Sequence, residues 1–103
     1  MIVEQRTYTL KPGATPEYMR LYEAEGFAVQ EPILGRLIGW YTTDFGSLNQ
    51  IIHIWGYDSY AERERRQAVL GADRRWKNFL SRILPLVLRQ ESKTLIPAPW
   101  SPS

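Results

Sequence analysis

The chain has 103 residues, which is enough for one hydrophobic core and leaves no room for a second. Its 44% apolar and 23% charged residues are typical of a folded globule, and the absence of cysteine excludes a disulfide framework, a thiolate metal site and a cysteine nucleophile. The net charge of +2 does not indicate a polyanion-binding tail. We therefore expect a single domain over residues 1–103.

The first half of the chain predicts a strand and a helix. Residues 2–10 alternate two side-chain sets and are rich in β-branched and aromatic residues, which is typical of a strand. Thr15, Pro16 and Glu17 then supply a capping hydroxyl, a first-turn proline and a first-turn acid, so a helix should begin there. We expect this helix to run to about Val29 and Pro32 to stop it.

A hairpin should follow. Residues 37–45 and 49–57 both resemble strands, and the short connection 46–48 suits an antiparallel turn.

A second helix and a last strand complete the chain. Ser59 and Glu62 match a capping box, in which the Glu62 side chain should reach back to the Ser59 amide. Residues 71–73 interrupt this helix, Asp73 can cap its continuation, and the helix should end at Pro85. Residues 86–96 predict the fourth strand, followed by a proline-rich tail over 97–103.

The element order β-α-β-β-α-β is that of an α+β, ferredoxin-like fold. It predicts a four-stranded antiparallel sheet with both helices on one face and with the first and third strands adjacent in the middle.

One face of such a sheet stays uncovered, and we expect polar and aromatic side chains to occupy it. Opposite charges at Glu4 and Arg6 would be costly beneath a helix unless fully paired, whereas Ile52 and Ile54 suit a position under helices. The side chains that we assign to the uncovered face are Glu4, Arg6, Tyr8, Asn49, Ile51, His53, Trp55 and Tyr57.

An open face with this many aromatic rings would be larger than the apolar patches that monomers usually expose. The economical cover is a second copy related by a twofold axis, which would close two sheets into one barrel around a polar cleft. We therefore predict a homodimer.

Four segments resemble the NIPSNAP family: residues 4–10, residues 46–57 with their Asn-x-x-x-His-x-Trp pattern, residues 62–66, and residues 97–102. The resemblance implies a dimeric α+β barrel, the superfamily that also contains cofactor-independent monooxygenases, haem-degrading enzymes and lactone isomerases. It implies no particular reaction, because the family has no agreed one.

His53 and Arg6 are the candidate catalytic residues. His53 is the only histidine, so any imidazole acid-base step must use it, and the Arg6 guanidinium could hold an anionic substrate. The structural alternatives are a sheet histidine bonded to Glu4 or Asn49 and an internal Glu4–Arg6 ion pair. The candidate substrate-binding residues are Glu4, Tyr8, Asn49, Trp55 and Tyr57.

We expect no metal and no cofactor, because one histidine without cysteine falls short of a usual ligand set. The arginines of the second helix are interleaved with acids, which favours a solvated face and no nucleic-acid partner. No apolar run is long enough for a membrane span and Glu4 and Arg6 do not resemble a signal peptide, so a cytoplasmic location is expected.

The leading hypothesis is a homodimer whose cleft binds a small anionic or aromatic molecule, for proton transfer or cofactor-independent oxygenation. The alternative is a non-catalytic protein-interaction scaffold.

Overall fold

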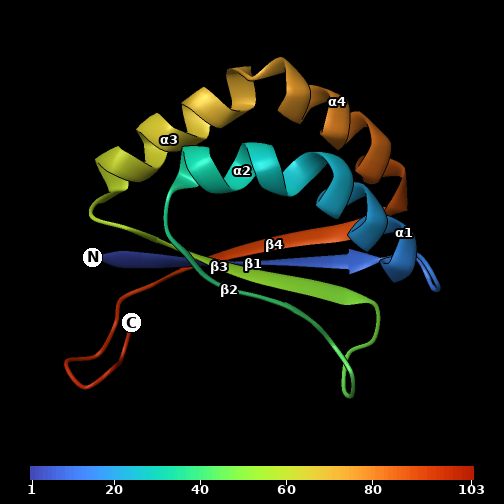
Figure 1. Ribbon diagram of the computed structural model, residues 1–103. Coiled ribbons are helices and arrows are strands. Elements are labelled where there is room, and N and C mark those ends of the chain that lie inside the picture. Colours follow the sequence, from blue (N-terminus) through green and yellow to red (C-terminus); the bar gives the residue numbers. More distant parts are fainter.

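The computed structural model describes all residues from 1 to 103. Helices form one layer and a single sheet forms the other (Figure 1). In chain order the elements are β1 (Ile2–Leu10), α1 (Thr15–Leu21), a π-helical turn (Tyr22–Gly26), α2 (Phe27–Leu34), β2 (Leu37–Thr42), β3 (Gln50–Tyr57), α3 (Tyr60–Ala72), α4 (Arg74–Ile83), a 3-10 turn (Leu84–Leu86) and β4 (Val87–Leu95).

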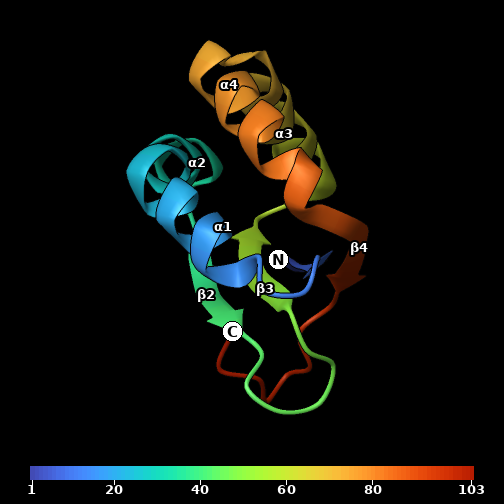
Figure 2. The same cartoon turned by 90° about the vertical axis from the view of Figure 1, so that its right-hand side faces the viewer.

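The sheet has the predicted α+β, ferredoxin-like topology. Its strand order is β2-β3-β1-β4 and every neighbouring pair is antiparallel, so the first and third strands lie in the middle. All helices cover the same face of the sheet, as the view along the layers shows (Figure 2). In the central register Arg6 lies opposite His53 on one side and opposite Ser92 on the other. This register decides which side chains meet.

The second helical segment begins and breaks where its polar residues predict. The Ser59 hydroxyl accepts from the Glu62 amide at 3.1 Å, and Asp73 caps α4 by accepting from the Arg75 amide at 2.8 Å. The return contact of the capping box differs by one residue, because the Glu62 carboxylate accepts from the Asp58 amide at 2.7 Å instead of the Ser59 amide.

The first helical segment departs from its prediction at both ends. Thr15 is already helical and no side chain caps the start of α1. Pro32 does not stop the helix, which continues to Leu34 and ends at Gly35 with a φ of 91°. Pro32 lacks the amide hydrogen that would bond four residues back, so the helix continues past it with one hydrogen bond fewer. Arg66 Nη1 donates to the Ile33 carbonyl at 3.1 Å, which satisfies one of the terminal carbonyls.

Gly26 allows the two helical segments to pack closely. A Cβ at this position would lie 3.0 Å from the Phe79 ring and 2.7 Å from the Tyr22 ring. This glycine stands at the end of the π-helical turn, so α4 approaches the backbone where the turn widens the helix.

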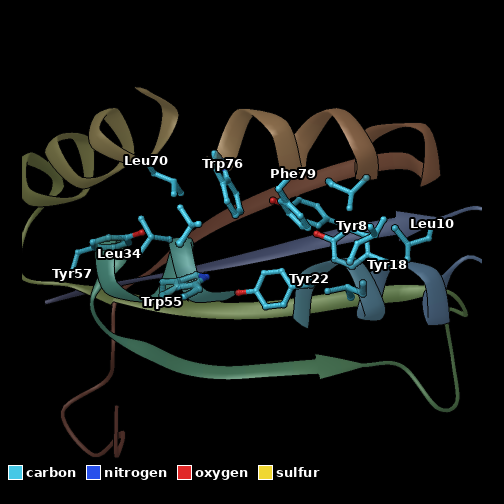
Figure 3. Close-up of a cluster of buried hydrophobic side chains, with 14 of the residues drawn as sticks. Tyr8, Leu10, Tyr18, Tyr22, Leu34, Trp55, Tyr57, Leu70, Trp76 and Phe79 are labelled. Carbon is cyan, nitrogen blue, oxygen red and sulfur yellow. The ribbon is translucent and has the colours of Figure 1, made fainter. Parts of the chain in front are cut away.

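The polar and aromatic side chains lie on the helix-covered face, and the sequence-based assignment to the uncovered face is wrong. Tyr8 contacts the Tyr18 ring of α1, and Glu4 is ion-paired with Arg63 of α3. Trp55 has no exposed surface, and Figure 3 shows Tyr8, Trp55 and Tyr57 pointing toward the helices.

Two physical effects explain why these side chains lie on the face opposite to the predicted one. The large aromatic rings bury more apolar area than Ile52 and Ile54, which favours placing them in the core. The penalty for burying the Glu4 carboxylate is offset, because Arg63 reaches it from a helix 59 residues later in the chain.

The uncovered face carries the alternate set of side chains. Ile52 and Ile54 of β3 are half-buried there, next to Gln5, Thr7 and Thr9 of β1. The tail beyond β4 has neither helix nor strand, as predicted, and it forms with Val3 a hollow at one end of the sheet. No helix in the structure has the length and apolar character that a membrane crossing requires.

Candidate functional site

Glu4 is a buried carboxylate at the centre of a partly buried charge network. Its carboxylate accepts from Arg63 Nε at 3.1 Å and Nη2 at 2.8 Å, from the Ser92 hydroxyl at 2.6 Å, and from Arg6 Nη1 at 3.3 Å. Burial by itself raises the pKa of Glu4, but the hydrogen bonds from Arg63 and Ser92 and the charges of both arginines outweigh it, so the pKa is lowered. One carboxylate therefore faces two guanidinium groups, and the network carries one excess positive charge.

The excess positive charge lies on Arg6, on the helix-covered face of the sheet. Its Nε donates to the Tyr8 hydroxyl at 3.0 Å and its Nη1 donates to Glu4, while Nη2 makes no hydrogen bond. Burial alone lowers the pKa of Arg6, but Tyr8 and Glu4 more than offset this and the pKa is raised. The guanidinium thus stays charged and keeps unused donors.

His53 lies opposite Arg6 on the neighbouring strand and close to Tyr8, among aromatic rings. Its Nδ1 accepts from Trp55 Nε1 at 2.6 Å, its ring stacks on Trp40 at 6.0 Å, and the Tyr8 ring meets it edge-on at 5.3 Å. Burial, reinforced by the charge of Arg6, lowers the pKa of His53 to about 3. The imidazole is therefore neutral near pH 7 with its proton on Nε2, and its one acceptor nitrogen is occupied.

A cavity of about 150 Å³ opens between the sheet and the helices, directly against Arg6 and Tyr8. Engineered apolar cavities of similar volume hold one benzene molecule. Three glutamines add polar groups to its wall, and the rest of the wall is apolar: Leu70, Trp76, Leu80, Ile83, Leu84 and Val87.

The glutamines present defined groups to this cavity. Gln30 is almost fully buried and its Oε1 accepts from the Tyr22 hydroxyl at 2.6 Å, which leaves its amide hydrogens unused. Gln67 donates to the Tyr57 hydroxyl at 3.3 Å, which leaves its carbonyl oxygen unused. Gln90 of β4 completes the polar part of the wall.

The family model described as NIPSNAP matches residues 3–102. This chain belongs to the NIPSNAP family. Human Protein NipSnap homolog 3A is 33% identical over 99 residues, which cover 94% of this chain and 39% of the relative. A Dictyostelium discoideum NipSnap homolog is 32% identical over 94 residues, covering 91% of this chain and 41% of the relative. The chain thus spans about two fifths of the length of these relatives.

Solved NIPSNAP structures agree with this fold closely. A family protein of unknown function from Agrobacterium tumefaciens has a TM-score of 0.96 and 43% identity, covering 99% of this chain and 92% of that one. A NIPSNAP-like domain protein from Burkholderia xenovorans has a TM-score of 0.96 and 45% identity, with coverages of 99% and 89%. A putative antibiotic biosynthesis monooxygenase from Nitrosomonas europaea has a TM-score of 0.70 at 5% identity, with coverages of 94% and 98%, and shares the fold alone.

The residues predicted from the sequence fall into three groups in this NIPSNAP domain. Arg6 and Tyr8 line the cavity. Four others are buried behind that wall: Glu4, His53, Trp55 and Tyr57. Asn49 lies apart, since it precedes β3 at about 13 Å along the strand from His53, where its positive φ of 60° shapes the turn and its carbonyl accepts from the Leu10 amide.

The sequence reasoning missed the glutamines and Arg63. One signal was available, because Arg63, Gln67 and Leu70 recur at helical spacing and Leu70 is a core residue. This periodicity places the two polar residues on the face of α3 that meets the sheet. No three His, Cys, Asp or Glu side chains gather in the structure in a way that could hold a metal ion.

Proposed function

We propose that this NIPSNAP domain binds a small organic anion in the cavity between sheet and helices, with Arg6 as the anchoring cation. The observation that supports this most directly is the Arg6 guanidinium on the cavity wall, with its Nη2 unbonded and with one positive charge in excess of Glu4. A bound carboxylate would complete the charge balance of this partly buried network. Tyr8 Oη accepts from Arg6, so its own hydrogen is free to donate to the same ligand oxygen.

The rest of the cavity defines the body of the ligand. Trp76, Leu80 and Ile83 provide an apolar wall opposite the polar groups, and the volume of about 150 Å³ limits the ligand to roughly one ring. A benzoate-like molecule, flat and singly charged, matches both features.

Binding is better supported than either reaction that the sequence suggested. Proton transfer and cofactor-independent oxygenation both require a group that exchanges a proton with the ligand, and Tyr8 is the only cavity-wall residue besides Arg6 with a titratable side chain. His53 is neutral and holds Trp55, so we assign it the role of positioning Tyr8 and Trp40.

The test is a titration with sodium benzoate, in which binding is measured by calorimetry and by tryptophan fluorescence, to which Trp76 of the cavity wall contributes. Arg6→Met should weaken benzoate binding by at least tenfold, because Glu4 stays paired with Arg63 in this variant while the anchor is gone. Arg74→Met, at an exposed arginine without an ion pair, is the matched control and should bind as the wild type does.

Two results would refute the proposal. One is equal benzoate affinity in the Arg6→Met variant and the wild type. The other is equal affinity of the wild type for benzoate and for neutral benzamide.

The uncovered sheet face supports the second candidate, a homodimeric scaffold. Tyr41 is 55% exposed and Ile52 and Ile54 are half-buried. The C-terminal tail, whose Trp100 is 86% exposed, runs on the side of the sheet away from the helices (Figure 1). We propose that a second copy covers this face. In such a dimer each Arg6 cavity stays within its own subunit, so the charged and aromatic residues that the sequence analysis placed in a cleft between subunits lie away from this contact.

A further inference from the structure

A second cavity, of about 320 Å³, opens between the first helical segment and the edge strand β2. It shares no lining residue with the Arg6 cavity. Its wall consists of three aromatic side chains, one methionine and one carboxylate: Tyr22, Phe27, Trp40, Met19 and Glu23.

The π-helical turn assembles this wall. The Phe27 amide bonds to the Tyr22 carbonyl, five residues earlier, which aligns the two side chains along the helix. In a regular α-helix residues five apart would point about 140° away from each other. As a result the Tyr22 and Phe27 rings lie 6.1 Å apart and the Trp40 ring lies 4.9 Å from Tyr22.

The rings are accessible to a ligand. Phe27 is 44% exposed and Met19 is 41% exposed, although both are large apolar side chains. Tyr22 and Trp40 form the deeper part of the wall, since Tyr22 is buried and Trp40 is half-buried. π-helical turns occur often at functional sites, because the wider turn costs stability that an ordinary helix would keep.

Glu23 is the only charged residue of this wall, and it has no cationic partner. The two acids that flank it along the segment are paired, Glu17 with Arg20 and Glu25 with Arg82, whereas Glu31 near the end of α2 forms no ion pair and does not line the cavity. No lysine or arginine forms an ion pair with Glu23, and none lines the cavity. An unpaired carboxylate beside aromatic rings is complementary to a positive charge that is carried on an apolar group.

We propose that this cavity binds a small alkylammonium ion of the quaternary type, with the headgroup of choline as the model. The methyl groups would contact the rings and Met19, the charge would be attracted by the ring faces, and Glu23 would supply the counter-charge. An organic anion is repelled by Glu23, and a neutral apolar molecule leaves the carboxylate unused. This proposal does not rest on the anion proposed for the Arg6 cavity, although Tyr22 of this wall bonds to Gln30 of that one.

The experiment compares choline with its neutral isostere 3,3-dimethylbutan-1-ol, in which carbon replaces the charged nitrogen. Binding is followed by the NMR signal of the Trp40 indole N–H during titration of the full chain. Choline should give a saturable shift, and the neutral alcohol should bind at least fivefold more weakly.

Two variants separate the charge from the aromatic surface. Glu23→Gln and Phe27→Ala alter exposed side chains, so both should fold, and each should weaken choline binding about fivefold. Glu64→Gln, at an exposed and unpaired acid on α3, is the control and should leave binding unchanged.

Equal affinity for choline and the neutral alcohol would show an apolar hollow without cation recognition. Unchanged choline affinity in Glu23→Gln, or no saturable shift in the wild type, would also overturn the proposal.

Discussion

Trp55 donates its indole N–H to Nδ1 of His53 at 2.6 Å, and both side chains are buried. The bond fixes the imidazole tautomer, with the proton on Nε2. It also explains why a histidine is needed at this position, because a neutral ring nitrogen can accept a hydrogen bond in a site where a charged group would be costly.

Replacing His53 by a residue without a hydrogen-bond acceptor should therefore lower the stability of the fold, even though it removes no charge. His53→Leu leaves the Trp55 N–H buried without a partner and should lower the free energy of unfolding by about 1–3 kcal/mol beyond the change in packing. His53→Gln keeps an acceptor and should cost less. Urea unfolding of the two variants checks this, and equal losses would show that the hydrogen bond contributes nothing.

The stability of the protein should fall as the solution is acidified. His53 has a folded-state pKa of about 3 and an ordinary value of 6.5, so between these values the unfolded chain binds the extra proton. The contribution of the neutral His53 to the free energy of unfolding is complete above pH 6.5 and declines as the pH falls toward 3, at up to about 1.4 kcal/mol per pH unit. Glu4, whose folded-state pKa is lowered from 4.5, adds a further loss below that pH.

Urea unfolding at a series of pH values measures this dependence. His53→Gln should remove the part between pH 6.5 and 4.5 and leave the part that belongs to Glu4. A wild-type stability that is flat between pH 6.5 and 4.5 would contradict the burial of a neutral imidazole.

Glu4 should be among the residues whose loss is most destabilising. Glu4→Gln leaves Arg6 and Arg63 facing each other without a counter-charge, and the expected cost is about 3–5 kcal/mol. Arg63→Met should cost less, because Arg6 and Ser92 still contact the carboxylate. A double-mutant cycle on Glu4 and Arg63 isolates their coupling, and additive losses would contradict a direct interaction.

The local elements of the fold could be predicted from the sequence because their signals are local. Ser59 and Asp73 cap helices within three residues of themselves, and the order of strands and helices leaves few topologies open. The face of the sheet could not be predicted in the same way. The Glu4 carboxylate is fully hydrogen-bonded only once Arg63 is placed by tertiary packing, whereas the cost of burying the Glu4 and Arg6 charges beneath a helix can be read from β1 alone.

The candidate site could also be predicted only where the signal lies within one strand or helix. Arg6 and Tyr8 were found because charge and aromatic character stand out along a strand, but Gln30 and Gln67 resemble ordinary helix-surface residues. Only the position of α2 and α3 over the sheet turns them inward. The Asn49 side chain was assigned a chemical role, whereas the structure uses that residue for a left-handed backbone conformation in the β2–β3 loop.

Two glycines in helical segments should respond in opposite ways to the same substitution. Gly26→Ala forces a Cβ into the Tyr22 and Phe79 rings and should destabilise the domain by about 1–3 kcal/mol. Gly71→Ala meets no atom within 4 Å near the end of α3 and should stabilise it by about 0.5 kcal/mol. Thermal unfolding of both variants provides the comparison, and a stable Gly26→Ala protein would show that α4 is packed less closely than the structure indicates.

The uncovered face should control the oligomeric state. Ile54 is half-buried on β3 without contributing to the helix-covered core, so Ile54→Lys adds a charge where a second copy is proposed and leaves the folded monomer intact. The wild type should sediment at about twice 12.0 kDa and the variant at 12.0 kDa. Val69→Lys, which adds the same charge on the exposed side of α3, is the control and should remain dimeric. A monomeric wild type would show that no second copy covers this face. An Ile54→Lys protein that still dimerises would show that the subunits meet elsewhere, because a buried lysine without a partner cannot be accommodated between two packed sheets.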